Sequence, residues 1–193
     1  MGGEEVIAAW LKYEYQNRTD FKAMVDNQIP QYIGIITNPN LGNAIENQER
    51  LSILTQYRPF VSSIAAGDWW VAEIDKADFA GLKLIDSGDW RFITDGTLDP
   101  TRAAEKIDKD ATLRNGICSR QVNFILSGYR QLSLSSSRVT LVGASKEGPF
   151  TVVDGVHRTV AMALYYIVKT HESFANKESY VGLTGTPFNL HFS

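Results

Sequence analysis

The stretch that decides the fold is TVVDGVHRTVAMALYY, which runs from Thr151 to Tyr166. It opens with a β-branched run typical of a strand, turns at Asp154-Gly155, and continues as an apolar segment with helical spacing. The turn carries an acid, a glycine, a histidine and an arginine, which is an unusually polar set for the junction of two buried elements. We therefore take this strand–turn–helix junction as the candidate functional site.

The segments around the junction predict a small mixed sheet with helices. A helix is expected from Val156 to about Thr170, and a longer one from Leu113 to Gln131. Turn composition in SKEGP (145–149) predicts that the strands on either side of it form a hairpin. The segments with the β-branched and aromatic composition of strands are WWVAEI (69–74), WRFIT (90–94), RVTLVGA (138–144), FTVVD (150–154) and SYVGLTG (179–185). Short helices are expected between the first two strands and after Pro100.

The first sixty residues predict helices only. Apolar residues recur at helical spacing in Glu4–Gln16, after the N-cap candidates Thr19 and Asp20, and in AIENQERLSILTQY (44–57). Pro30 is expected to end the second helix, and TNPNLGN (37–43) to form a loop. The fold class is therefore α+β, with a helical N-terminal subdomain over residues 1–60 and an α+β core over residues 61–193.

Composition is that of an ordinary globular protein. Of the 193 residues, 44% are hydrophobic and 21% are charged, and the net charge is −3. The longest apolar run, Val160 to Val168, is far shorter than the roughly 20 residues that cross a bilayer. The N-terminus lacks the basic start of a secretory signal, and the single cysteine, Cys118, permits no intramolecular disulfide. We expect a cytoplasmic protein that does not enter a membrane, with Cys118 as a small buried hydrophobe rather than a reactive thiol.

Charge is distributed unevenly along the chain. Residues 111–193 carry 8 basic and 4 acidic side chains, although the whole chain is acidic. This basic excess surrounds the junction, so it suits an anionic small molecule, although chance clustering on a solvated surface would give the same pattern. The acidic total argues against nucleic acid as a partner, because binding to a phosphate backbone needs several Lys or Arg contacts.

The junction has the groups that a phosphate site needs. Gly155 permits a sharp turn and a close approach of a ligand to the backbone, and the N–H groups that follow it open a helix. Arg158 can grip two phosphate oxygens in its planar fork, and His157 can donate to a phosphate or face the core among apolar residues. Asp154 could hold Mg²⁺ together with substrate phosphates, accept a proton, orient Arg158, or simply cap the helix.

These residues resemble a known family. The segment GPFTVVDGVHRTVAMAL (148–164) is similar to the signature of the ParB/sulfiredoxin-like superfamily, in which a strand runs into a DGxHR turn and then a helix. The resemblance implies a nucleotide phosphate site, with His157 and Arg158 as the phosphate-contacting pair and Asp154 as the acid near metal and substrate. Gly155 and Val156 would contribute the backbone of the phosphate cradle.

Two departures from the family narrow the activity that the resemblance implies. Sulfiredoxins carry a catalytic cysteine where this chain has Val156, and a valine cannot form the attacking thiolate. Partition proteins carry a basic segment and a helix-turn-helix that are not recognisable here. Among the family's members, this chain resembles most closely the pattern of the nucleotide-dependent small-molecule kinases.

We therefore expect an enzyme that transfers a phosphoryl group from ATP, with Mg²⁺, to a small-molecule acceptor. Asp95, in the turn TDGT (94–97), is a further candidate contact to the nucleotide, although an ordinary turn would look the same. Lys146 and the serines 135–137 are weaker candidates. The helical N-terminal portion would serve as a substrate lid or as the surface of a homo-oligomer. The alternatives are a non-catalytic module that senses a nucleotide and binds a protein, and a ParB-like nuclease.

Overall fold

The computed structural model describes residues 1–110, 112–113, 116, 120–123, 125, 138–170 and 172–184. The chain divides into two compact units, Met1–Trp70 and Val71–Ser193. The division falls ten residues beyond the boundary expected at residue 60, so α5 and the first residues of strand β1 belong to the first unit.

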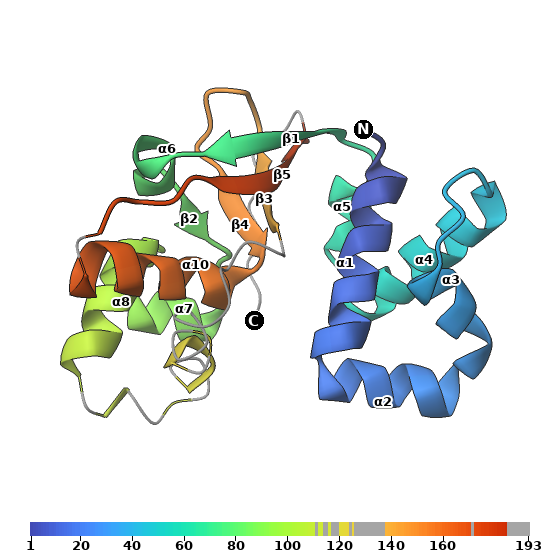
Figure 1. Cartoon of the computed structure of the whole chain (residues 1–193), viewed down its shortest axis with the longest axis horizontal. Coiled ribbons are helices and arrows are strands. Elements are labelled where there is room, and N and C mark those ends of the chain that lie inside the picture. Colours follow the sequence, from blue (N-terminus) through green and yellow to red (C-terminus); the bar gives the residue numbers. More distant parts are fainter. Residues whose placement is uncertain are drawn as a thin grey trace. The chain divides into compact units, whose positions relative to one another are not determined.

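The first unit is entirely helical up to the start of β1 (Figure 1). Its elements are α1 (Gly3–Asn17), α2 (Thr19–Gln28), the 3-10 helix η1 (Pro30–Tyr32), α3 (Ile33–Thr37), α4 (Ala44–Tyr57) and α5 (Val61–Ile64). The predicted helices are therefore confirmed, and Pro30 follows the end of α2 as expected. Their apolar faces meet in a core that includes Trp10, Leu11 and Phe21, all of which are nearly or fully buried.

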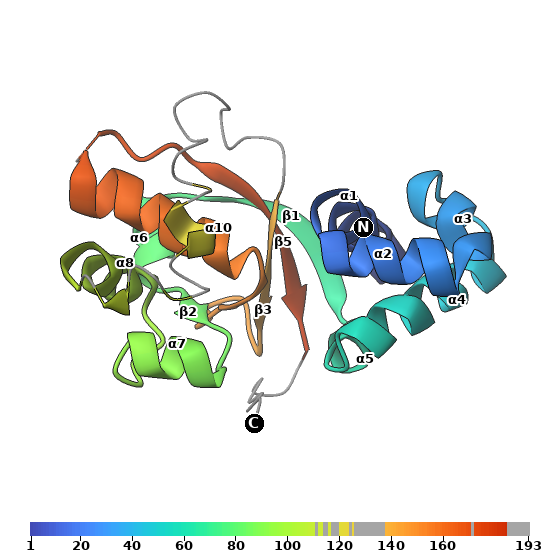
Figure 2. The same ribbon diagram turned by 90° about the horizontal axis from the view of Figure 1, so that it is seen from below.

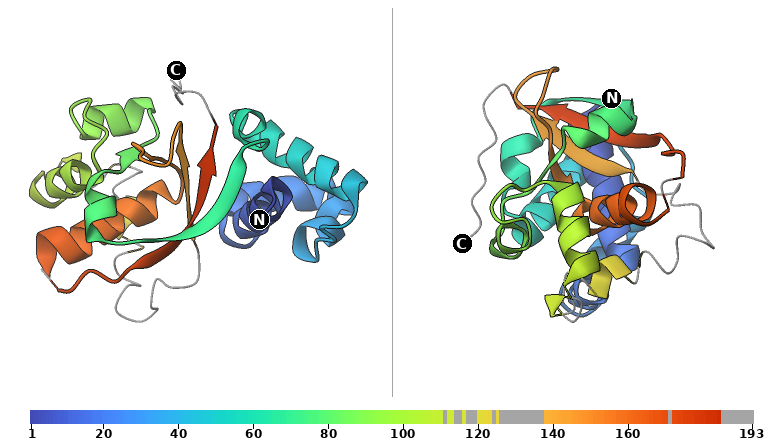
Figure 3. Two further views of the ribbon diagram at one scale, coloured as in Figure 1. Left: turned by 90° about the horizontal axis from the view of Figure 1, so that it is seen from above. Right: turned by 90° about the vertical axis from the view of Figure 1, so that its left-hand side faces the viewer.

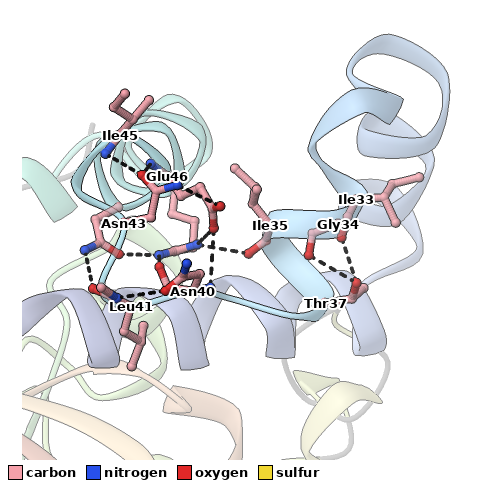
Figure 4. Close-up of polar contacts among 12 residues, drawn as sticks. Ile33, Gly34, Ile35, Thr37, Asn40, Leu41, Asn43, Ile45 and Glu46 are labelled. Carbon is pink, nitrogen blue, oxygen red and sulfur yellow. Dashed lines mark hydrogen bonds and ion pairs between the residues drawn. The ribbon is translucent and has the colours of Figure 1, made fainter.

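A buried arginine fixes the loop that joins α3 to α4. Arg50 lies in α4 with no exposed surface, and its guanidinium donates to the backbone oxygens of Ile35 and Asn40 at 3.3 and 3.1 Å. It also donates to the carboxylate of Glu46 at 3.3 Å and to the side-chain oxygen of Asn47 (Figure 4). The asparagine-rich loop is therefore held from inside by a charged side chain.

A five-stranded mixed sheet in the order β1-β5-β3-β4-β2 belongs to the second unit, apart from the first three residues of β1. The strands are β1 (Asp68–Ile74), β2 (Lys83–Leu84), β3 (Val139–Gly143), β4 (Thr151–Asp154) and β5 (Lys177–Leu183). Strands β3 and β4 are antiparallel, which confirms the predicted hairpin, and β3 and β5 are parallel, as are β2 and β4. Figure 3 shows β1 and β5 side by side at one margin of the sheet.

Helices cover one face of this sheet (Figure 2). They are α7 (Gly88–Ile93), α8 (Pro100–Lys109), α10 (Val156–Met162) and the π-helical turn η4 (Ala163–Lys169) that continues α10. Helix α10 packs on β3 and β4, while α8 packs on α10 and η4. The short helix α6 (Lys76–Ala80) connects β1 to β2 and begins with a capping box at Asp75.

One predicted strand is wrong. Residues 90–94 were expected to be extended, but Trp90 and Ile93 lie in α7. Trp90 and Ile93 are buried, while Phe92 between them is 67% exposed. The two core-facing residues are therefore three positions apart, which is the spacing of a helix.

The helix expected over residues 113–131 falls mostly outside the described residues. In the described part of the chain, no helix combines the length and apolar character that crossing a membrane requires.

Candidate functional site

The strand directions bring several polar residues to one edge of the sheet. Strands β2 and β4 are parallel, with Leu84 opposite Val152, so their carboxyl ends point the same way. Because β3 and β5 run against β4, both of them begin at this edge. The end of β4 at Asp154 and the start of β5 at Lys177 therefore lie at the same end of the strands, which we call this edge of the sheet. Ligands of sheets with parallel strands commonly bind beyond the carboxyl ends of those strands.

Gly155 makes the turn from β4 into α10. Its φ angle is +81°, in the left-handed region that side chains disfavour, and it is the N-cap residue of α10. A Cβ atom at this position would lie 2.7 Å from Cγ1 of Val139 and 2.8 Å from Nη2 of Arg158. Both the backbone conformation and the close approach of the guanidinium therefore require glycine.

Asp154 and Arg158 form a buried ion pair across this turn. Nη2 of Arg158 donates to Oδ2 of Asp154 at 3.0 Å, and the two side chains are only 8% and 14% exposed respectively. Helix α10 has no side-chain cap, so the interpretation of Asp154 as a helix cap is wrong. Its carboxylate instead orients Arg158, and the guanidinium lies against the Cα of Gly155.

His157 is half-buried and lies against α7. Its ring makes an edge-on contact with the ring of Trp90, with 5.2 Å between the ring centroids. Trp90 itself is 4% exposed, so the imidazole packs against a buried side chain. This contact was missed from the sequence because residues 90–94 were expected to form a strand, whereas Trp90 lies in α7.

Lys177 is a member of this edge that the sequence pattern did not indicate. It begins β5 and is 8% exposed, which is rare for a lysine. Burial lowers the pKa of its ammonium group, and the charge of Arg158 lowers it further, against a smaller opposing effect of Glu178. Lys177, Glu178 and Ser179 are all polar, so no apolar alternation in the sequence extends the predicted strand back from Ser179 to Lys177.

Asp95 is held elsewhere in the same unit. Its backbone is left-handed, with φ at +53°, and its carboxylate accepts from Arg102 at 3.0 Å and from Lys106, both in α8. These hydrogen bonds, first to Lys106 and then to Arg102, lower the pKa of Asp95. Among the described residues, no hydrogen bond or ion pair joins Asp95 to the junction. Its contact with a nucleotide stays a prediction.

The weaker candidates do not join the junction within the described structure. Lys146 lies in the turn between β3 and β4, at the opposite end of β4 from Asp154. Cys118 and the serines 135–137 lie outside the described residues.

A hollow of about 570 Å³ runs along α8 and contains none of the predicted site residues. Its lining is Arg102, Glu105, Lys106, Lys109, Asp110 and Thr112.

The junction offers one carboxylate, that of Asp154, as a metal ligand. The described residues contain no cluster of three or more His, Cys, Asp or Glu side chains that could hold a metal ion. Mg²⁺ commonly binds through one or two carboxylates together with substrate phosphates and water. Oδ2 of Asp154 already accepts from Arg158, and a metal ion at Asp154 stays a prediction.

Comparison with known proteins neither supports nor opposes this assignment. No protein-family model, curated protein or solved structure matches the chain. The resemblance of residues 148–164 to the ParB/sulfiredoxin-like signature therefore stays a prediction, and the functional argument depends on the geometry of the junction.

Proposed function

We propose that the protein is a nucleotide-dependent enzyme that transfers a phosphoryl group from ATP to a small-molecule acceptor at the junction of β4 and α10. The observation that carries this proposal is the placement of Arg158. Its guanidinium is buried, held by Asp154 and pressed against Gly155, at the edge where β2 and β4 end. An arginine oriented by a carboxylate is prepared to bind phosphate oxygens in a defined direction.

The remaining roles follow from the chemistry of each group. The backbone of Gly155 and Val156 opens α10 and can donate to phosphate oxygens, as the first N–H groups of helices do. His157, fixed by Trp90, can donate a hydrogen bond to the same ligand. Asp154 would hold Mg²⁺ or accept the proton of the acceptor. When bound, Mg²⁺ would neutralise phosphate charge, and the protein would supply mainly positioning.

The proposal extends to the setting of the reaction. ATP and Mg²⁺ would be used in the cytoplasm, and the helical first unit would act as a lid or as a contact surface between copies of the chain.

A non-catalytic nucleotide sensor is the second candidate. The near-complete burial of Asp154 and Arg158 favours it, because a catalytic carboxylate must reach its acceptor. Consumption of ATP that depends on an added acceptor distinguishes the enzyme from the sensor.

A thermal-shift panel of ATP, ADP, CTP and GTP with Mg²⁺ tests the phosphate site. A ligand at 100 times its dissociation constant stabilises a protein by about 2.7 kcal/mol. For a chain of this size that corresponds to roughly 5–10 °C in melting temperature. We expect at least one nucleotide to produce this shift in the wild type and none to produce it in Arg158→Ala.

The matched control for this panel is Arg91→Ala, which removes an arginine of the same unit whose side chain is 55% exposed. We expect it to keep the shift of the wild type. The shift of each variant is the difference between its melting temperatures with and without ligand, so a change in the variant's own stability does not affect the comparison. A wild type that no nucleotide stabilises at millimolar concentration, or an Arg158→Ala protein that responds like the wild type, would overturn the proposal.

A further inference from the structure

Residues 27–45 of the first unit carry no charged side chain, although 21% of the whole chain is charged. This charge-free stretch begins after Asp26 and ends before Glu46. It runs from the end of α2 through η1 and α3 into the first turn of α4. Charged residues are depleted in the same way at the centres of protein–protein contacts.

Two large apolar side chains of the charge-free stretch face solvent. Ile45, in the first turn of α4, is 71% exposed, and Leu41, in the preceding loop, is 38% exposed. In Figure 4 both side chains point away from the polar contacts that surround Glu46. Scattered apolar residues are normal on a protein surface. Here their exposure coincides with the absence of charge, which is the combination expected of a contact surface.

The backbone that carries these two side chains is held in place before any partner binds. Asn47 donates to the carbonyl oxygen of Leu41 at 2.8 Å, and Asn43 accepts from the amide of Ile45 at 3.1 Å. The buried Arg50 holds the same loop from inside through two backbone oxygens. A surface that is already fixed loses little conformational freedom on association, so less of the contact energy is spent on ordering it.

The charges of the first unit favour a second copy of the chain as the partner. Residues 1–70 carry 5 basic and 8 acidic side chains, so a contact between two copies through a charged face would bring acidic surfaces together. The commonest symmetric contact uses the same patch on both copies, and that patch must therefore be complementary to itself. The charge-free stretch meets this condition. Its apolar side chains can pack together, and the exposed amides of Asn38 and Asn40 can both donate and accept hydrogen bonds.

We propose that two copies of the chain associate through the charge-free stretch, in a two-fold contact with Ile45 as its apolar centre. This inference develops the contact-surface role proposed above for the first unit. It does not depend on the nucleotide site, because the charge-free stretch contributes no residue to the junction of β4 and α10.

Sedimentation velocity of the full chain, from micromolar to millimolar concentration, tests the inference. We expect the wild type to pass from monomer to dimer as its concentration rises. Ile45→Asp and Gly34→Asp should each raise the dissociation constant by roughly tenfold or more, because each places like charges against one another across the two-fold axis. Gly34 lies in α3, and nothing lies within 4 Å of the position that its Cβ would take, so an aspartate there does not disturb the monomer.

Phe92→Asp and Gly88→Asp are the matched controls, and both residues lie in α7 of the second unit. Phe92 is 67% exposed, close to the exposure of Ile45. Gly88 is exposed, and nothing lies within 4 Å of its Cβ position either. Both controls should dimerise as the wild type does. If circular dichroism shows that Ile45→Asp does not fold, Ile45→Ser replaces it and should also associate more weakly than the wild type.

Three results would overturn the inference. The first is a wild type that stays monomeric at millimolar concentration. The second is dimerisation of the Ile45 and Gly34 variants that equals that of the wild type. The third is an equal loss of association in the two controls, since the contact would then not be specific to the charge-free stretch. None of these results bears on the nucleotide-induced thermal shift, so the nucleotide site is tested separately.

Discussion

Replacing Arg50 with methionine is expected to lower the free energy of unfolding by about 3–5 kcal/mol, the range found when one partner of a buried ion pair is removed. Arg50 is fully buried and donates to two backbone oxygens, of Ile35 and Asn40, as well as to two side chains. Methionine would leave these part-buried acceptors without their donor. Urea denaturation followed by circular dichroism measures the change.

Arg18→Met is the control for this prediction, because it removes an arginine of the same unit whose ion pair is exposed to solvent. Arg18 contacts Asp20 at 3.2 Å, and the two side chains are 37% and 60% exposed. Surface pairs of this kind contribute less than about 1 kcal/mol. Equal losses in the Arg50 and Arg18 variants would mean that the loop between α3 and α4 does not depend on its buried arginine.

The local elements were predictable because their signals are local. Helical spacing identified α1, α2 and α4, and turn residues between two β-branched runs identified the β3–β4 hairpin. The Asp-Gly turn at residue 155 was predictable for the same reason, since a left-handed backbone favours glycine. The error at residues 90–94 came from composition. Aromatic and β-branched residues favour a strand, while the spacing of the buried Trp90 and Ile93 belongs to a helix.

The burial of charged residues was not predictable, because it depends on contacts between distant segments. From the sequence, Arg50 is expected to be a solvated residue of an amphipathic helix. In the structure, its guanidinium donates to backbone oxygens of Ile35 and Asn40, which precede the helix. Lys177 lies at the same edge as Asp154 only because β5 pairs with β3, and that parallel pairing joins residues about 40 positions apart. The sequence therefore indicated the Asp154–Arg158 segment of the site and gave no indication that the start of β5 lies at the same edge.

Replacing Gly155 with alanine is the second change expected to have a large effect. A left-handed backbone costs a residue with a side chain roughly 1–2 kcal/mol. The added Cβ would also overlap Cγ1 of Val139 and Nη2 of Arg158, at 2.7 and 2.8 Å, and overpacking of this kind costs about 1–3 kcal/mol. We expect a loss of about 2–5 kcal/mol, which corresponds to roughly 4–20 °C in melting temperature for a chain of this size.

Gly96→Ala separates the two causes. Gly96 has a φ angle of +80°, nearly that of Gly155, but nothing lies within 4 Å of the position that its Cβ would take. It should therefore show the cost of the backbone alone, about 1–2 kcal/mol. The difference between the two variants measures the overlap with Val139 and Arg158. Because that overlap displaces the guanidinium, Gly155→Ala should also lose the nucleotide-induced thermal shift that Gly96→Ala keeps. If the two variants lose equal stability and both keep the shift, Arg158 does not depend on its contact with the turn, and the guanidinium is not held in place for a ligand.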